Sequence, residues 1–341
     1  MTSWFSSPAS RSWIAPAPSR AARAFHASLD GYAPTPLTEV PVLAAELGVG
    51  SVWIKDESSR LGLPAFKVLG ASWACRQVLQ EHPGAALVTA TDGNHGRAVA
   101  RMARHFGVGA TVFVPAVMRR ETELLITGEG AQVLRIDADY DETVRRAAAH
   151  AEDQANTVLV QDTAWPGYEQ VPAWIVEGYD TLLSEIDEAL GRQPDLVAVP
   201  VGVGSLAEAV VRHYRQGPGD GASVLSVEPD TAACTLASLH GGESVSVETA
   251  ATVMAGLNCG TVSSTAWPVL RDGCDAAVAV TDREALTAVA DLGALGISSG
   301  PSGAATLAGA RAALLGPDRR EALGLGADAT IVLLSTESNQ S

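Results

Sequence analysis

The chain has 341 residues, enough for about two domains and a sizeable core, which excludes a peptide, a single small module and a disulfide-stapled scaffold. Its 23 Lys and Arg against 39 Asp and Glu give a formal net charge of −16, and the resulting field repels phosphate backbones and anionic membrane surfaces. We therefore expect neither a nucleic-acid partner nor a membrane partner.

The first 29 residues contain Arg11, Arg20 and Arg23 but no acidic side chain, a bias shared by organelle transit peptides. The segment lacks the continuous apolar core of a secretory signal, and it runs without a cleavage-like break into sequence typical of ordered structure at Phe25. We predict an N-terminal arm packed on the body of the protein, with a transit peptide as the alternative.

The next segment, residues 30–58, is rich in turn residues at 34–37, helical in pattern at 38–49 and strand-like at 51–55. We expect it to pack against the second half of the chain, which makes the α/β unit between them an insertion.

From Ala85 onward, short β-branched or aliphatic runs alternate with longer amphipathic stretches, the pattern of a parallel sheet covered by helices. The predicted strands lie at 86–90, 110–114, 131–136, 157–161, 195–201, 223–228, 276–280 and 329–335. The predicted helices lie at 94–107, 119–128, 140–153, 172–190, 205–216, 232–239, 282–292 and 302–315. The predicted fold class is therefore α/β.

The four cysteines, Cys75, Cys234, Cys259 and Cys274, show neither a CxxC pattern nor a Cys/His cluster at zinc-ligand spacing. We expect reduced thiols, no metal ion and a cytoplasmic location. No apolar run approaches the roughly 20 residues that a membrane-spanning helix requires.

The stretch VPVGVGSLA at 199–207 places a glycine turn between a buried strand and a helix, where backbone amides at the helix N-terminus can bind a phosphate. Gly202, Gly204 and Ala207 also fit the dinucleotide fingerprint GxGxxG/A, and Glu228 ends the next strand near the expected acidic position. A nicotinamide-dependent oxidoreductase is one alternative here, and glycines that serve only close packing are another.

The stretch PAFKVLGA at 64–71 places Lys67 in an apolar neighbourhood at the start of a predicted helix. Such a neighbourhood favours the neutral, nucleophilic amine, so Lys67 is a candidate for a Schiff base. The alternative is a lysine whose stem covers apolar surface.

The stretch TATDGNHG at 89–96 follows a predicted strand and leads into a helix. It offers a second set of backbone amides together with the side chains of Asp92, Asn94 and His95. The alternative is a capped helix start without a further role.

Together these stretches resemble the fold-type II pyridoxal-phosphate enzymes, the group of threonine dehydratase and cysteine synthase, and most of all the diaminopropionate ammonia-lyase branch. The resemblance covers nearly the whole chain. It rests on AFHASLDGYAPTPL at 24–37, KDES at 55–58, AFK at 65–67, TDGNHGR at 91–97, QDTAW at 161–165, GVGS at 202–205, MAGL at 254–257 and STE at 335–337. The AFK and glycine motifs are generic, whereas QDTAW together with TDGNHG is specific to the ammonia-lyase branch.

The resemblance implies two open, twisted, mostly parallel sheets, each covered by helices. We expect a large cofactor-binding domain from residues 1–70 and 172–341 and a smaller inserted α/β domain from residues 71–171. The active site would lie in the cleft between them. The habit of the family also implies a homodimer.

The resemblance further implies roles for single residues. Lys67 would hold pyridoxal 5'-phosphate as a Schiff base, Asn94 would bond the ring hydroxyl, and Ser335 would face the pyridine nitrogen. The residues that would bind the cofactor phosphate are Gly202, Val203, Gly204, Ser205 and Leu206. Those that would receive the substrate carboxylate are Thr91, Asp92, Gly93 and His95.

Two aspartates bear on the substrate. Dehydratases of this fold usually carry serine where Asp92 stands, and a carboxylate near the scissile Cβ, such as Asp162, suits a substrate with a second ammonium. The resemblance thus implies an ammonia-lyase that converts 2,3-diaminopropionate, or a close β-substituted amino acid, to pyruvate and ammonia. Lys67, Asp92 or Asp162 would remove the α-proton. For each aspartate the alternative is a helix cap or a loop anchor.

The chain departs from the pattern of this branch at three places: Leu61 stands where phenylalanine is expected, CGTV occupies 259–262, and Ser338 replaces a glycine. These changes bear on the substrate more than on the reaction type. A serine or threonine dehydratase, a β-replacement synthase of the same fold and a catalytically silent binding protein are the remaining alternatives.

Overall fold

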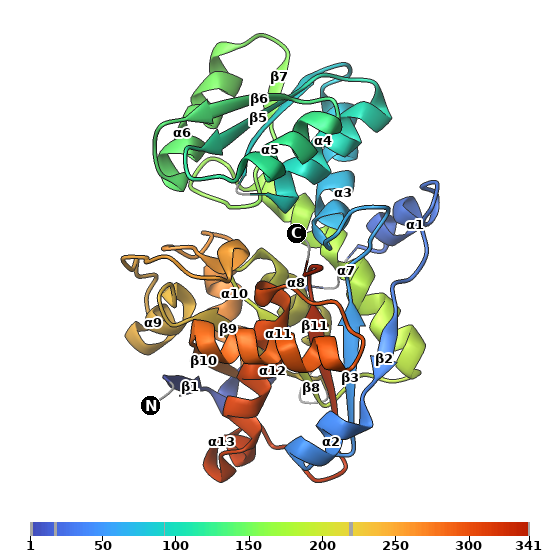
Figure 1. The fold of residues 1–341 in the computed structure, drawn as a ribbon, viewed down its shortest axis with the longest axis vertical. Helices are drawn as coiled ribbons and strands as arrows, with labels where there is room; N and C mark the ends of the chain where they lie inside the picture. Colours follow the sequence, from blue (N-terminus) through green and yellow to red (C-terminus); the bar gives the residue numbers. More distant parts are fainter. Residues whose placement is uncertain (1–2, 17–18, 92, 218–220, 340–341) are drawn as a thin grey trace.

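The computed structural model describes residues 3–16, 19–91, 93–217 and 221–339. Within these ranges the strands form two sheets that lie in separate parts of the molecule (Figure 1), a seven-stranded sheet of order β1-β10-β9-β8-β11-β3-β2 and a four-stranded sheet of order β6-β5-β4-β7. Helices cover both sheets, so the predicted α/β class with two mostly parallel sheets is confirmed.

The larger sheet combines strands from both ends of the chain. Its strands are β1 (Trp4–Ser6), β2 (Leu37–Glu39), β3 (Ser51–Asp56), β8 (Leu196–Pro200), β9 (Ser223–Pro229), β10 (Ala276–Val280) and β11 (Thr330–Ser335). Only the edge strands β1 and β2 pair antiparallel, with β10 and β3 respectively. Strand β3 pairs in parallel with β11, so the segment at 30–58 joins the second half of the chain as expected.

The parallel strands of the larger sheet are buried on both faces, which explains their unbroken apolar runs. Val197 and Val332 share one hydrophobic cluster with residues of α3, α7, α8 and α10. Their neighbours Leu196 and Leu333 share another cluster with residues of α2, α11 and α12. Successive side chains of a strand point to opposite faces, so the two clusters are the two sides of this sheet.

The smaller sheet consists of β4 (Ala86–Ala90), β5 (Ala110–Pro115), β6 (Gln132–Ile136) and β7 (Thr157–Leu159), and all of its pairs are parallel. Phe113 packs in a cluster with residues of α6, and its neighbours Val112 and Val114 pack in a cluster with residues of α4 and α5. This sheet too is covered on both faces.

The helices are α1 (Ala21–Ala27), α2 (Pro41–Leu47), α3 (Lys67–Glu81), α4 (Asn94–Phe106), α5 (Arg120–Gly128), α6 (Tyr140–Asp153), α7 (Gln170–Leu190), α8 (Ser205–Tyr214), α9 (Cys234–Gly241), α10 (Ala266–Gly273), α11 (Asp282–Ala294), α12 (Pro301–Leu314) and α13 (Pro317–Ala322). Two 3₁₀ turns lie at Pro8–Ser12 and Ala255–Leu257.

The predicted strands and helices all occur, with ends shifted by a few residues. Helices α1, α10 and α13 and strands β1 and β2 are present without having been predicted, and β2 occupies the first residues of the helical pattern expected at 38–49. No helix among the described residues is long and apolar enough to cross a bilayer.

The N-terminal arm packs on the body, as predicted. Strand β1 extends the larger sheet at its edge, and the guanidinium of Arg11 donates to Asp275 at 3.2 Å and to the hydroxyl of Ser223 at 2.5 Å. Trp13 approaches Gly273 so closely that a Cβ there would lie 2.8 Å from the indole ring. The arm is therefore part of the folded core.

Helices α3 and α7 touch at two glycines. A Cβ on Gly178 would lie 2.5 Å from the carbonyl oxygen of Leu69, and one on Gly70 would lie 2.6 Å from the ring of Tyr179. The two backbones can approach only because neither residue has a side chain. This contact fixes the first turn of α3, which begins with Lys67.

Candidate active site

A cavity of about 620 Å³ lies at the carboxyl ends of strands from both sheets. The loop after β4 supplies Thr91, Gly93, Asn94 and His95, and the turn after β8 supplies Gly202 to Leu206. Open parallel sheets bind ligands at this edge, outside the carboxyl ends of their strands. The residues that the sequence predicted in these two segments therefore lie around one cavity. The division into domains at 70/71 and 171/172 remains a prediction.

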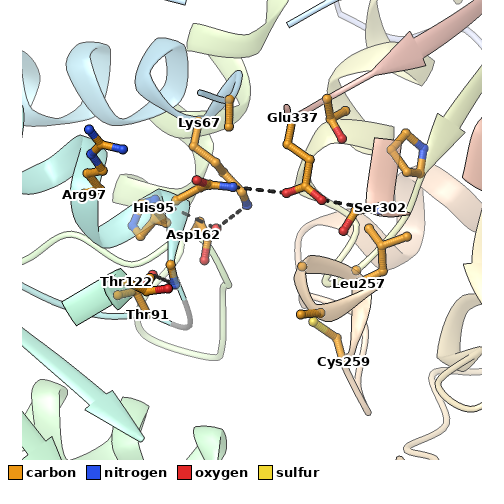
Figure 2. A pocket seen from close by; sticks show the side chains of 18 of the residues that line it. Lys67, Thr91, His95, Arg97, Thr122, Asp162, Leu257, Cys259, Ser302 and Glu337 are labelled. Carbon is orange, nitrogen blue, oxygen red and sulfur yellow. Dashed lines mark hydrogen bonds and ion pairs between the residues drawn. The ribbon is translucent and has the colours of Figure 1, made fainter. Parts of the chain in front are cut away.

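Lys67 and Asp162 form an ion pair inside this cavity (Figure 2). The Lys67 Nζ lies 2.6 Å from Oδ2 of Asp162, which follows β7. Burial opposes ionisation of Asp162, but the charge of Lys67 outweighs it and holds the pKa of this carboxyl well below its usual range. The apolar surroundings expected for Lys67 are thus only part of its environment, since a buried carboxylate faces its amine.

His95 stands beside this pair without adding a positive charge. Its ring is 4% exposed, and burial, the largest effect, lowers its pKa, so the ring is neutral near pH 7. Because the carbonyl oxygen of Val160 lies 2.9 Å from Nε2, the proton sits on Nε2, and Nδ1 is left as an acceptor 3.9 Å from Asp162 Oδ2.

The loop that carries Asn94 is held by Thr91. The Thr91 hydroxyl oxygen accepts the backbone N–H of Gly93 at 2.9 Å and that of Gly96 at 3.0 Å. A Cβ on Gly96 would lie 2.3 Å from the Thr91 methyl carbon, so the loop can close this tightly only with glycine there. Asp92, the other predicted catalytic aspartate, lies outside the described residues.

The glycine turn presents backbone to the cavity. Gly204 adopts a φ of +99° as the N-cap of α8, a conformation that glycine takes without strain. Gly202 has no room for a side chain, because a Cβ there would lie 2.9 Å from the carbonyl oxygen of Gly256 and 3.2 Å from the Cys259 sulfur. The first turn of α8 leaves N–H groups without intrahelical acceptors, and the Ser205 hydroxyl fixes the turn by donating to the Asp162 carbonyl at 2.5 Å.

Ser335 lies at the end of β11, 1% exposed, and its hydroxyl donates to the Ser299 hydroxyl at 2.8 Å. The next two residues, Thr336 and Glu337, line the cavity. The side chain of Glu337 accepts a hydrogen bond from Asn94 Nδ2 at 3.1 Å. The motif at 335–337 supported the family resemblance, but nothing in its pattern singled out Glu337 as a cavity residue.

Further cavity residues were not predicted. Some come from residues 253–259, the start of α12 and the end of the described chain, among them Val253, Gly256, Cys259, Pro301, Ser302 and Asn339. Others come from the β5–α5 region and from the starts of α4 and α6, and they are Arg97, Pro115, Val117, Met118, Arg119, Thr122, Leu125 and Tyr140. Their position directly after strands β4, β5 and β6 is the only signal in the sequence that could have marked them.

The residues fit a pyridoxal phosphate group. A lysine amine reaches into the cavity, and a glycine turn at a helix N-terminus, suited to a phosphate, lines the same cavity. The match to a family model agrees: residues 29–337 match the family described as "Pyridoxal-phosphate dependent enzyme". The chain belongs to this family, and its cofactor is pyridoxal phosphate.

Within the family the chain is similar to diaminopropionate ammonia-lyases. It is 37% identical over 350 aligned residues to the diaminopropionate ammonia-lyase of Escherichia coli strain K12, covering 93% of this chain and 87% of that one. The crystal structure of the Escherichia coli enzyme in complex with an aminoacrylate-PLP azomethine reaction intermediate superposes with a TM-score of 0.90 at 34% identity, covering 100% of this chain and 95% of that one. The human L-serine dehydratase/L-threonine deaminase is 28% identical over 75% of each chain.

Glu228, which suggested a nicotinamide cofactor, has a different role. Its two carboxylate oxygens accept the backbone N–H groups of Thr235 and Leu236 at 2.8 Å each, and the side chain is fully buried. It therefore caps the start of α9 and does not line the cavity. Family membership decides against the oxidoreductase alternative.

Proposed function

We propose that this protein eliminates ammonia from 2,3-diaminopropionate, which with one water gives pyruvate and two ammonia. The observation that carries the proposal is the pairing of the Lys67 amine with a buried, ionised Asp162 in the cavity that the glycine turn also lines. A carboxylate held ionised at this place suits a substrate with a second ammonium group. The likeness to diaminopropionate ammonia-lyases along nearly the whole chain supports it.

In this scheme Asp162 takes a proton from Lys67. Covalent attachment of the cofactor aldehyde needs the neutral amine, so a proton must leave Nζ, and Asp162 Oδ2 is the acceptor 2.6 Å away. When bound, pyridoxal phosphate supplies an electron sink for the pair of electrons left at Cα. We infer that Lys67, once displaced by the substrate amine, removes the α-proton, and that the Asp162 carboxylate, ionised again, pairs with the β-ammonium, which already carries the proton with which it leaves as ammonia. Asp92 is proposed as the base for the opposite substrate face.

The remaining roles are those that the family resemblance implies. We infer that Gly202, Val203, Gly204, Ser205 and Leu206 bind the phosphate, that Asn94 donates to the ring hydroxyl, and that Ser335 faces the pyridine nitrogen. We infer that the residues receiving the substrate carboxylate are Thr91, Asp92, Gly93 and His95. The one proton of the neutral His95 ring is directed at Val160, so His95 takes part in this contact by packing, and the hydrogen bonds come from the other groups of the loop.

An assay of pyruvate and ammonia from diaminopropionate, serine, threonine and O-acetylserine tests the proposal against its closest alternative. That alternative is a serine or threonine dehydratase, and the similarity to the human L-serine dehydratase/L-threonine deaminase is the reason to include serine and threonine. We expect diaminopropionate to have the highest kcat/KM, and we expect Asp162→Asn to reduce its turnover more than that of serine. Faster turnover of serine than of diaminopropionate would overturn the proposed substrate.

The expected homodimer and cytoplasmic location stay predictions. Light scattering on the purified protein measures the first directly, and a native mass near twice 35.1 kDa is the expected result.

A further inference from the structure

Glu337 lies on one wall of the cavity, and Lys67, His95 and Asp162 lie on the opposite wall (Figure 2). Two of its hydrogen-bond partners belong to different parts of the fold. Oε2 accepts from Asn94 Nδ2 at 3.1 Å, and Oε1 accepts the backbone N–H of Ser302 at 3.3 Å. Asn94 begins α4, which packs on the smaller sheet, whereas Ser302 lies in the first turn of α12, which packs on the larger sheet.

The backbone around Glu337 leaves its side chain little freedom. Its carbonyl oxygen accepts the N–H of Gly300 at 3.0 Å, and the residue pairs as a β-bridge with Ala65. A Cβ on Gly300 would lie 2.8 Å from Glu337 Oε1, so the carboxylate fits closely over the start of α12. A helix N-terminus favours negative charge, which stabilises the ionised form of Glu337 at this place.

The chemistry of the two groups fixes the orientation of the amide. An ionised carboxylate only accepts hydrogen bonds, whereas the amide of Asn94 can present either a donor or an acceptor. Facing Glu337, the amide must therefore turn its NH₂ group toward the carboxylate. One hydrogen of Nδ2 goes to Glu337, and the second stays available for another acceptor in the cavity.

We propose that Glu337 is a positioning residue that holds the Asn94 amide with Nδ2 toward the cofactor. The inference rests on the proposed role of Asn94 as donor to the ring hydroxyl oxygen. An Asn94 free to flip would present its carbonyl oxygen to that ring oxygen for part of the time, and two acceptors would then face each other. Glu337 removes this second orientation.

Glu337→Gln tests the inference, because glutamine keeps the shape but offers Asn94 either a donor or an acceptor. We expect the Kd of the apoprotein for pyridoxal phosphate to rise about tenfold, the size of one lost hydrogen bond. We also expect the visible absorbance band of the holoprotein to shift, together with its pH dependence. Glu121→Gln is the matched control, since it removes the same charge from an exposed position at the start of α5 and should change neither quantity.

A double-mutant cycle separates positioning from a general structural effect. If Glu337 acts through Asn94, then Glu337→Gln in an Asn94→Ala background should change the Kd by less than about twofold, compared with about tenfold in the wild type. It should also leave the position of the band nearly unchanged. An Asn94→Ser background gives the same comparison should the alanine variant lose the cofactor. An equal effect of Glu337→Gln with and without Asn94, or no effect in the wild type, overturns the inference.

These measurements use no substrate, so their outcome is independent of the elimination reaction. If diaminopropionate is not turned over but the cycle shows coupling, the substrate proposal fails and the role of Glu337 stands. If diaminopropionate is turned over but the cycle shows no coupling, only the role of Glu337 fails.

Discussion

Lys67 and Asp162 lie 95 residues apart in the sequence, yet the amine of one contacts the carboxylate of the other at 2.6 Å. One begins the helix that leads into the smaller sheet, and the other follows the last strand of that sheet in chain order. The two places where the chain enters and leaves this sheet thus supply the two charged groups of the site.

Reduction of the holoprotein with borohydride should attach the cofactor permanently to Lys67 alone. The sequence contains only two lysines, and the other, Lys55, is 1% exposed and donates to Glu185 at 2.6 Å. Mass spectrometry of the digested protein measures the site of attachment. Lys67→Ala should lose both the visible band and the modified peptide, and a modified Lys55 would contradict the assignment.

Asp162→Asn should lower kcat about 10²- to 10⁴-fold, the usual contribution of a positioned acid or base. The pKa of Asp162 lies well below its usual range, so this group contributes stability above pH 3.8 that is lost only as the pH falls further. Its titration should therefore not cause any loss of activity between pH 7 and pH 5. Asp137→Asn, at an exposed position after β6, is the control and should leave kcat unchanged. A pH–rate profile whose acid limb near pH 6 disappears in Asp162→Asn would contradict the low pKa.

Gly202→Ala should weaken cofactor binding about tenfold or more, because the new Cβ would lie 2.9 Å from the Gly256 carbonyl oxygen and would displace the turn. Gly293→Ala, inside α11 with nothing within 4 Å of its Cβ, is the control and should stabilise the fold by up to about 1 kcal/mol. Titration of the apoproteins with pyridoxal phosphate gives the two affinities. Equal affinity in both variants would mean that the turn tolerates the side chain.

His213 should stabilise the fold in a pH-dependent way. Burial lowers its pKa, but hydrogen bonds to Asp180 Oδ1 at 2.6 Å and Asp187 Oδ2 at 3.0 Å outweigh burial and raise it to about 9. The stabilisation is then complete below pH 6.5 and is lost as the pH rises through about 9. A rise from 6.5 to about 9 corresponds to on the order of 3 kcal/mol. Denaturant unfolding of the wild type and His213→Gln should show a stability difference at pH 6 that shrinks by pH 10, whereas a constant difference would argue against a charged His213.

Glu185→Gln should destabilise the fold by about 3–5 kcal/mol, because it leaves the buried cations of Lys55 and Arg60 without their shared carboxylate. The carboxyl group is fully buried, and although burial opposes its ionisation, Arg60 and Lys55 hold its pKa at about 2. Glu188→Gln is the matched control: its side chain is 61% exposed and pairs with Arg23, so its loss should cost less than about 1 kcal/mol. Similar losses in both variants would show that the buried cluster is not ionised.

Most of the fold could be predicted because its parallel strands are buried on both faces and appear as short apolar runs, as at β8 and β11. Strand β1 has only three half-buried residues, and α13 has no buried residue, so neither leaves a periodic pattern. Gly316, which directly follows the helix predicted at 302–315, is the N-cap of α13.

The candidate site was predictable where one stretch of sequence carries several groups, as in TDGNHG and the glycine turn. The contacts of Lys67 with Asp162 and of Asn94 with Glu337 join residues 95 and 243 positions apart. Such contacts depend on how the two sheets sit relative to each other, which no local pattern encodes. The family resemblance supplied Asp162, but it gave Glu337 no role.

Strand β1 covers the free edge of β10 at the end of the larger sheet. Without it, β10 would present a row of unpaired N–H and C=O groups, a template on which another chain can add a strand. Removing the first six residues would therefore do more than shorten the protein, because it would expose the edge of β10 and promote aggregation through strand pairing.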